Sequence, residues 1–135
     1  MGKGQVSLEY MAIIGLALLI GTPLVIQAQK SSQDLQQSFR NGLAKSALNS
    51  MEEAARLVHS QGPPARVTFR VRLPAGIMQT NVTDNYLHIR RDVGAGSTDF
   101  YNTVEFNVTG EIPENSGTHR MVAEAEESYV NITAK

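Results

Sequence analysis

The feature that most constrains this chain of 135 residues is a long uncharged run near its N-terminus. From Tyr10 to Gln29 no residue carries a charge. A helix that rises about 1.5 Å per residue needs about 20 such residues to cross the hydrocarbon core of a bilayer. The run therefore predicts a membrane-spanning helix over residues 10–29. A signal peptide and a plain membrane anchor are the two commonest uses of such a run.

The residues before the run argue against both. A secretory signal has its small-residue cleavage site after the apolar segment. Here Lys3 and Gly4 precede that segment and are followed by Gln5. Cleavage after Gly4 removes only residues 1–4 and leaves the apolar segment on the mature chain. Glu9 stands at the entrance of the run, and an acid in a membrane segment costs a few kcal/mol, so it normally has a partner. After cleavage, we expect that partner to be the α-amino group of Gln5, on this or another copy.

The segment Lys-Gly-Gln-Val-Ser-Leu-Glu-Tyr at residues 3–10, followed by a long apolar helix, resembles the class III signal of archaeal type IV pilin-like proteins. The resemblance covers the leader and the N-terminal helix, and the remainder only in general style. It implies a prepilin peptidase that cuts after Gly4, so that Glu9 becomes the fifth mature residue. In that family this glutamate guides docking by pairing with a neighbour's N-terminus. The set from Ser7 to Tyr10 is typical of adhesive pilins, since archaellins usually have a Gly-rich, acid-free segment there.

Small residues and one proline interrupt the apolar run. Gly15 and Gly21 allow the backbones of neighbouring helices to approach closely, although their spacing is not that of a GxxxG pair. Pro23 cannot donate to the carbonyl of Leu19, so we expect a kink or local loosening there. The hydroxyl of Thr22 is the expected substitute for part of the lost bonding. A plain transmembrane helix with a proline bend is the alternative interpretation.

The helical period continues beyond the membrane segment. Apolar residues recur at steps of three and four, and polar residues fill the other face, so this half predicts an amphipathic helix with one face covered by the head. Its stripe is Leu35, Phe39, Leu43, Ala47, Leu48, Met51, Ala55 and Val58. The helix should run from about Val6 and end at Gly62-Pro63-Pro64, because glycine suits a left-handed cap and proline cannot continue a helix.

After the prolines the period changes to two. Alternation predicts strands over 67–73, 77–82, 86–90 and 103–108, with turns at 74–76 and 84–85 and loops over 92–99 and 110–117. Residues 118–127 fit either a helix, by their Ala and Glu content, or a strand, by their alternation. We predict a strand, paired through a turn at 127–128 with a strand over 129–133.

These elements predict an α+β fold in which a long N-terminal helix, apolar and then amphipathic, carries a small antiparallel sheet or sandwich as its head. This is the lollipop architecture of type IV pilins. The expected organisation is a leader over 1–4, the long helix over 5–62 and a β-rich head over 65–135. A head of this size has a marginal core, so packing on the helix or association should stabilise it. The chain has no Cys, which excludes disulfides and thiolate metal sites, and its net charge of −1 with no basic run does not predict a nucleic-acid-binding surface.

No motif predicts an enzyme, a metal site or a cofactor. His59, His88 and His119 each lack a second ligand at metal spacing, and surface or structural roles are the expectation. Gly94-Ala95-Gly96 lacks the lysine of a phosphate loop. No serine lies in a nucleophile-elbow context.

Three Asn-x-Thr triplets, at Asn81, Asn107 and Asn131, are candidate N-glycosylation sites. About one is expected by chance. Alternation places Asn107 and Asn131 outward, and an outward asparagine in an extracellular protein is what a glycan requires.

The leading functional prediction is a structural subunit of a cell-surface pilus, with its precursor in the membrane and its mature form in an extracellular filament that serves adhesion. The resemblance implies identical pilins, a prepilin peptidase, an assembly ATPase and a membrane platform protein as partners. One alternative is a membrane-anchored extracellular binding protein that uses the same leader. A minor pilin that initiates or tips the filament is another.

Overall fold

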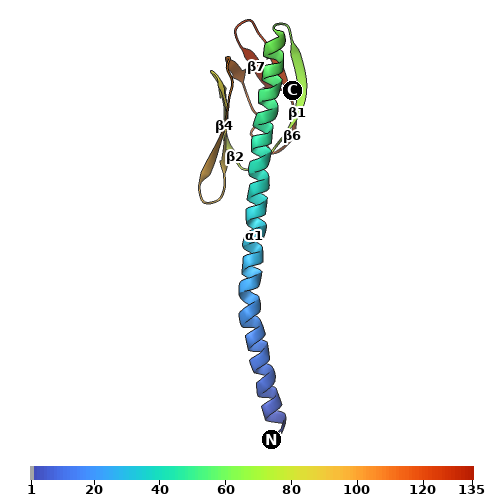
Figure 1. The fold of residues 1–135 in the computed structure, drawn as a ribbon, viewed down its shortest axis with the longest axis vertical. Coiled ribbons are helices and arrows are strands. Elements are labelled where there is room, and N and C mark those ends of the chain that lie inside the picture. The colour runs from blue at the N-terminus through green and yellow to red at the C-terminus, as the bar shows by residue number, and fades with distance from the viewer. Residues whose placement is uncertain (1) are drawn as a thin grey trace. The chain divides into compact units, whose positions relative to one another are not determined.

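The computed structural model describes residues 2–135 and confirms the predicted α+β fold. One helix, α1 (Gly2–Gln61), is followed by seven strands in two sheets (Figure 1). The chain divides into two compact units, the first ending at Gln37 and the second being Ser38–Lys135. The second unit therefore contains the last part of α1 together with both sheets.

Helix α1 begins at Gly2, so the predicted start near Val6 is wrong by four residues. Once a helix is nucleated, each further residue adds one backbone hydrogen bond, and nothing in residues 2–5 forbids helical backbone angles. The helix also continues through Pro23. The Thr22 hydroxyl donates to the Leu18 carbonyl at 2.7 Å. The carbonyl that lacks its usual donor because of Pro23 is that of Leu19, one residue later.

Helix α1 ends where the sequence predicts. Gly62 has a φ of +74°, and its N–H donates to the Val58 carbonyl at 3.0 Å. This is the left-handed cap that glycine forms without a steric penalty, and it satisfies a carbonyl of the last helical turn.

A four-stranded sheet has the order β1-β6-β7-β5. The strands are β1 (Arg66–Leu73), β6 (Gly117–Ala125), β7 (Val130–Ala134) and β5 (Val108–Gly110). Pairing is antiparallel except between β5 and β7, which are parallel. The ambiguous segment 118–127 is thus a strand as far as Ala125, residues 126–129 connect it to β7, and its predicted pairing with the last strand is confirmed.

A three-stranded antiparallel sheet has the order β2-β3-β4, with β2 (Ile77–Thr83), β3 (Tyr86–Asp92) and β4 (Ser97–Thr103). Hydrogen bonds tie it to the β5 region of the other sheet. The Val108 N–H donates to the Asp84 carbonyl at 2.6 Å, and the Thr80 hydroxyl donates to the Ile112 carbonyl at 3.0 Å. In Figure 1, β1 and β6 lie on one side of α1, and β2 and β4 lie on the other.

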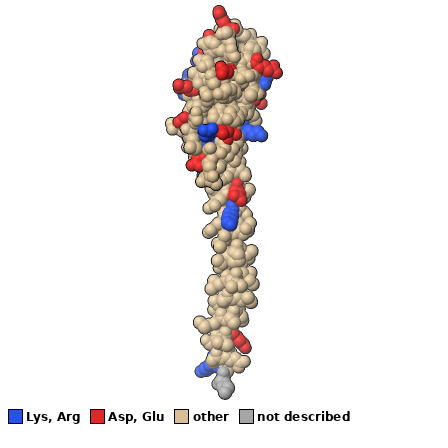
Figure 2. All heavy atoms as spheres, turned by 90° about the vertical axis from the view of Figure 1, so that its left-hand side faces the viewer, with Lys and Arg blue, Asp and Glu red and all other residues tan. Residues whose placement is uncertain are grey.

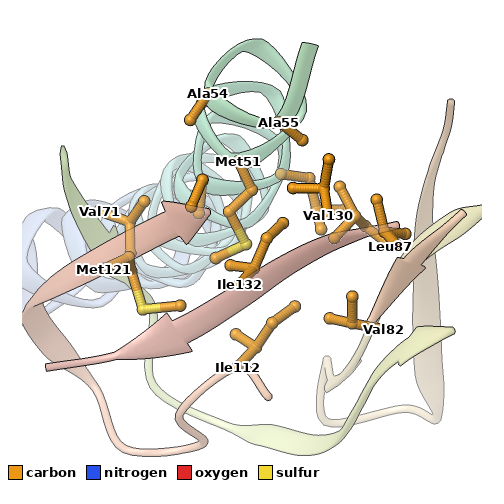
Figure 3. Close-up of a cluster of buried hydrophobic side chains, with 14 of the residues drawn as sticks. Met51, Ala54, Ala55, Val71, Val82, Leu87, Ile112, Met121, Val130 and Ile132 are labelled. Atoms are coloured by element: carbon orange, nitrogen blue, oxygen red, sulfur yellow. The ribbon is translucent and has the colours of Figure 1, made fainter. Parts of the chain in front are cut away.

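The core lies between the last part of α1 and the inner faces of the sheets. Met51 and Ala55 point from the helix toward Ile132 and Val130 of β7, and Leu87 of β3 lies in the same cluster (Figure 3). Met51, Leu87, Val130 and Ile132 are fully buried. Each such side chain contributes about 1.5–3 kcal/mol by leaving water, so these contacts hold the helix to the sheets.

Two strand predictions are wrong. Residues 103–108 do not form one strand, because β4 ends at Thr103 and β5 begins only at Val108. Val104, on the irregular connection between the sheets, and Val108, the first residue of β5, are nevertheless both buried. The predicted loop 92–99 shrinks to residues 93–96, because Ser97–Asp99 pair with Arg90–Asp92.

The expected cover of the amphipathic helix by the head is incomplete. The buried helical residues begin at Ala44, whereas Leu35 and Phe39 have exposed fractions of 71% and 60%. The apolar period in the sequence is continuous across this boundary, but burial of the helix is confined to residues from Ala44 onward.

Candidate assembly helix and head surfaces

The N-terminal part of α1 exposes a continuous apolar surface. Within the described residues 2–135, α1 is the one helix that is long and apolar enough to cross a membrane, and none of its most apolar stretch is buried. Figure 2 shows a stretch of this helix with no charged atoms between those near its N-terminal end and those further along. The large exposed apolar residues are Val6, Leu8, Tyr10, Met11, Ile13, Ile14, Leu16, Leu18, Leu19, Ile20, Leu24, Val25 and Ile26. An exposed surface of this extent needs lipid or protein to cover it.

The predicted assembly residues all lie on this exposed part of the helix. Glu9 and Tyr10 are exposed in its third turn, and Lys3, Gly4 and Gln5 form its first turns. The structure thus places the predicted cleavage site within helical backbone.

Gly15 and Gly21 have open surroundings. Nothing lies within 4 Å of a Cβ added at either position. The fold of the single chain therefore does not require glycine at either position.

A buried arginine connects α1 to the three-stranded sheet. Arg91 of β3 is 1% exposed, its Nη1 donates to Asn41 Oδ1 of α1 at 2.7 Å, and its Nε donates to the Ala75 carbonyl at 3.0 Å. Burial, and then the nearby charge of Arg40, lower the pKa of the Arg91 guanidinium, while Asp92 opposes this shift. A buried charge held by directed hydrogen bonds fixes geometry more than it adds stability. Sequence reasoning did not single out Arg91, because a strand's alternation reveals which face a residue is on but not its hydrogen-bond partners.

A second polar cluster lies on the outer face of the three-stranded sheet. His88 Nε2 and Asp99 Oδ1 are 2.8 Å apart, and Arg90 Nε donates to the same oxygen at 2.8 Å. The His88 ring stacks on Tyr101 with centroids 4.6 Å apart. Hydrogen bonds from Arg90 and then His88 lower the pKa of the Asp99 carboxyl, and Asp99 in turn raises the pKa of Arg90.

The three histidines lie apart from one another, and each makes its own contact within the fold. His59 stacks on Phe106 with centroids 4.0 Å apart, and His119 Nε2 lies 2.7 Å from the Asn115 carbonyl oxygen. Within residues 2–135 no group of three or more His, Cys, Asp or Glu side chains is arranged to hold a metal ion.

The three candidate glycosylation asparagines differ in accessibility. Asn107 is exposed, on the connection between β4 and β5. Asn131 is half-buried on the outer face of β7, paired in register with Thr109 and Glu124. Asn81 is also half-buried, and its Nδ2 donates to the Tyr86 hydroxyl at 3.4 Å. Asn107 is therefore the site that a glycosylating enzyme reaches most easily.

Two surface hollows flank the segment 110–112. One of about 420 Å³ is bordered by Thr80, Asn81 and Glu114, and one of about 680 Å³ by Pro113, Asn131 and Thr133. Neither has an aromatic side chain in its lining, and small-molecule sites are usually rich in aromatic residues.

Comparisons of the chain with protein-family models, with curated proteins and with solved structures find no match.

Proposed function

We propose that this chain is the structural subunit of an archaeal type IV-like surface pilus, made in the membrane and polymerised through its N-terminal helix. The observation that carries the proposal is the exposed apolar surface of α1 between residues 10 and 29, on a helix whose later residues bury one face against the sheets. Lipid covers such a surface before assembly, and the equivalent helices of other copies cover it afterwards.

The energetic basis is an exchange of contacts. In lipid an apolar helix has no hydrophobic reason to associate, so close packing and polar contacts must drive helices together. Gly15 and Gly21, where an added Cβ meets nothing in the single chain, let a second helix backbone approach. Glu9, exposed at the start of the apolar run, pairs with the α-amino group of Gln5 of a neighbour once residues 1–4 are removed.

The proposal is tested first on the protein recovered from cells. Surface filaments are sheared, purified and analysed by mass spectrometry, and the expected N-terminal residue is Gln5. A chain that still begins at Met1 within the filament contradicts the proposed processing. The absence of this chain from filaments, with cells that lack it carrying normal filaments, contradicts the proposed role.

Glu9→Ala separates assembly from insertion. The variant should be processed and inserted as the native chain is, because the apolar run is unchanged, but filament number per cell should fall at least tenfold. Glu53→Ala is the matched control, since it removes an exposed acid from the same helix outside the apolar run. Normal filament numbers in Glu9→Ala cells would remove Glu9 from the mechanism.

The second candidate is a membrane-anchored extracellular binding protein. The two hollows beside residues 110–112 favour it, because their volumes fall within the range of small-molecule sites. It predicts that the chain stays in the membrane fraction as single copies and that filaments are unaffected by its deletion.

A further inference from the structure

The outer face of the four-stranded sheet gathers basic side chains that lie far apart in the sequence. Strand β1 places Arg66, Arg70 and Arg72 on this face, because the alternate residues Val71 and Leu73 are buried on the inner face. All three arginines are exposed.

Register brings two more basic residues beside them. Arg70 of β1 lies directly opposite Arg120 of β6. The last pair in the ladder between β6 and β7 is Met121 with Ala134. The Lys135 N–H donates to the Arg120 carbonyl at 2.8 Å, so the pairing continues by one residue and Lys135 lies opposite Arg120. Because neighbouring strands are about 4.8 Å apart, three basic residues occupy one row across the sheet. We call Arg66, Arg70, Arg72, Arg120 and Lys135 the basic face.

The charge on this face is not balanced within the chain. It carries five of the 12 Lys and Arg residues but three of the 13 Asp and Glu residues, which are Glu124 opposite Arg66, Glu126 just beyond the end of the same strand, and Glu111 beside Thr133. In residues 2–135 the ion pairs are those of Arg56, His88 and Arg90, so neither Arg70 nor Arg120 has an acidic partner. Like charges directly opposite on a sheet are destabilising.

The edge position of β1 explains charge on its own arginines, but it does not explain Arg120 on the interior strand β6 or Lys135 at the end of the interior strand β7. Val122, the apolar residue on the outer face of β6, is 3% exposed and needs cover from its neighbours. A long uncharged side chain such as glutamine would provide that cover without repulsion. The arginines are therefore better explained by a negatively charged partner.

We propose that the basic face binds a linear acidic polysaccharide through its carboxylates. Four of the five basic residues are arginines, whose planar guanidinium groups form paired hydrogen bonds with carboxylates. Along and across the strands their spacing is about 5–7 Å, which suits a polymer with one carboxylate per sugar. The face is a sheet surface with every basic residue exposed, so an extended chain can lie along it.

The residues between the cations favour a polysaccharide over a nucleic acid. They are Thr68, Thr118, Val122, Asn131 and Thr133, and the exposed Tyr129 lies at the opposite end of β7 from Lys135, so no aromatic side chain stands between the cations on which a base could stack. Hydroxyl and amide groups, in contrast, form hydrogen bonds with sugar hydroxyls.

The basic face also points away from the part of α1 that packs on the sheet. Met121 and Ile132 lie on the opposite face of the same strands and belong to the core shared with that helix (Figure 3). If α1 lies inside a filament, the basic face lies at the periphery. This placement rests on the proposed function, whereas the binding chemistry does not.

The test uses the full chain, produced without glycans and held in an uncharged detergent. Binding to polygalacturonate is measured at low salt, with neutral dextran and duplex DNA as comparison polymers. Native protein should bind polygalacturonate more tightly than DNA and should not bind dextran. Arg70→Gln/Arg120→Gln should weaken binding about tenfold, because each exposed charge contact is worth about three- to fivefold. Lys30→Gln/Lys45→Gln, which removes the same charge from α1, should stay within about twofold.

One further variant separates paired hydrogen bonds from charge, and one further measurement excludes loss of folding as the cause of weaker binding. Arg70→Lys/Arg120→Lys keeps the charge but loses the paired hydrogen bonds, and should weaken binding about threefold. The Arg70→Gln/Arg120→Gln chain should unfold at the same temperature as the native chain or higher, since the repulsion is relieved.

Equal weakening by the two glutamine pairs, or tighter binding to DNA than to polygalacturonate, overturns the proposal. Because the assay uses unassembled protein, its failure leaves the pilus proposal standing. Conversely, a chain absent from filaments would leave this binding result intact.

Discussion

Gly110 lies where the structure has no room for a side chain. It is the last residue of β5, its φ is +142°, and a Cβ added there would overlap the backbone of Ile132 in β7. At the same contact, the Glu111 N–H donates a hydrogen bond to the Ile132 carbonyl at 3.0 Å. Gly110→Ala must therefore strain the backbone and also push β5 from β7.

The loss of stability can be estimated from these two effects. A non-glycine residue at such a φ costs about 1–3 kcal/mol. Forcing extra volume into packed surroundings costs about 1–3 kcal/mol more. Val108 and Ile112, both nearly fully buried, flank the displaced segment, so relaxation would expose apolar surface. We expect Gly110→Ala to lower the free energy of unfolding by about 3–5 kcal/mol, a large fraction of a small domain's stability.

Gly117→Ala is the matched control. Gly117 also has a positive φ, +116°, but an added Cβ meets nothing within 4 Å. Gly117→Ala should therefore lower the free energy of unfolding by the backbone cost alone, about 1–3 kcal/mol. Both variants are unfolded with urea in uncharged detergent, and the transition is followed by the near-ultraviolet circular dichroism of the head tyrosines. Equal losses in the two variants would refute the argument that contact between β5 and β7 requires glycine.

The remaining predictions concern acid stability and the helix–sheet core. Because the folded-state pKa of Asp99 is lowered, its contribution is present above its ordinary pKa of 3.8 and is lost as the pH falls through the lower folded value. Asp99→Asn should therefore be less stable than native protein at pH 7, and its stability should fall less steeply between about pH 5 and pH 2 in acid titrations; an unchanged slope contradicts this. Met51→Ala, at a fully buried position, should lower the free energy of unfolding by about 2–5 kcal/mol. Leu57→Ala, at a position 47% exposed on the same helix, should lower it by about 1 kcal/mol or less, and similar losses in the two variants would contradict the assigned core.

Different parts of the chain have different proposed roles. The part of α1 that exposes apolar residues is the proposed polymerising segment, and the head adds surfaces that differ from one another. On one sheet the outer face carries the paired cluster of His88, Arg90 and Asp99, and on the other it carries the basic face, in which Arg70 lies opposite Arg120. Substitutions on the basic face should therefore change what a filament binds without changing how many filaments form.

The sequence by itself determined those features that depend on local periodicity. The uncharged run over 10–29, the helical period up to Gly62 and the alternation over 67–73 and 86–90 each encode their element within a few neighbouring residues, because side-chain direction repeats every 3.6 or every 2 residues. The α+β class and the helix end were predictable for that reason, whereas residues 118–127 fitted both a helix and a strand until pairing with β1 and β7 decided for the strand. The proposed function, in contrast, depends on the leader residues 3–10.

Only the tertiary structure decided which distant residues meet. Alternation shows that Arg70 and Arg120 face outward, but only the register of β1 with β6 places them opposite each other. The hydrogen bond between Arg91 and Asn41 and the close approach of Gly110 to Ile132 likewise join segments that no local pattern relates. Leu35 and Phe39 continue the helical stripe in sequence yet stay uncovered, because burial depends on where the strands end and not on the helix's own period.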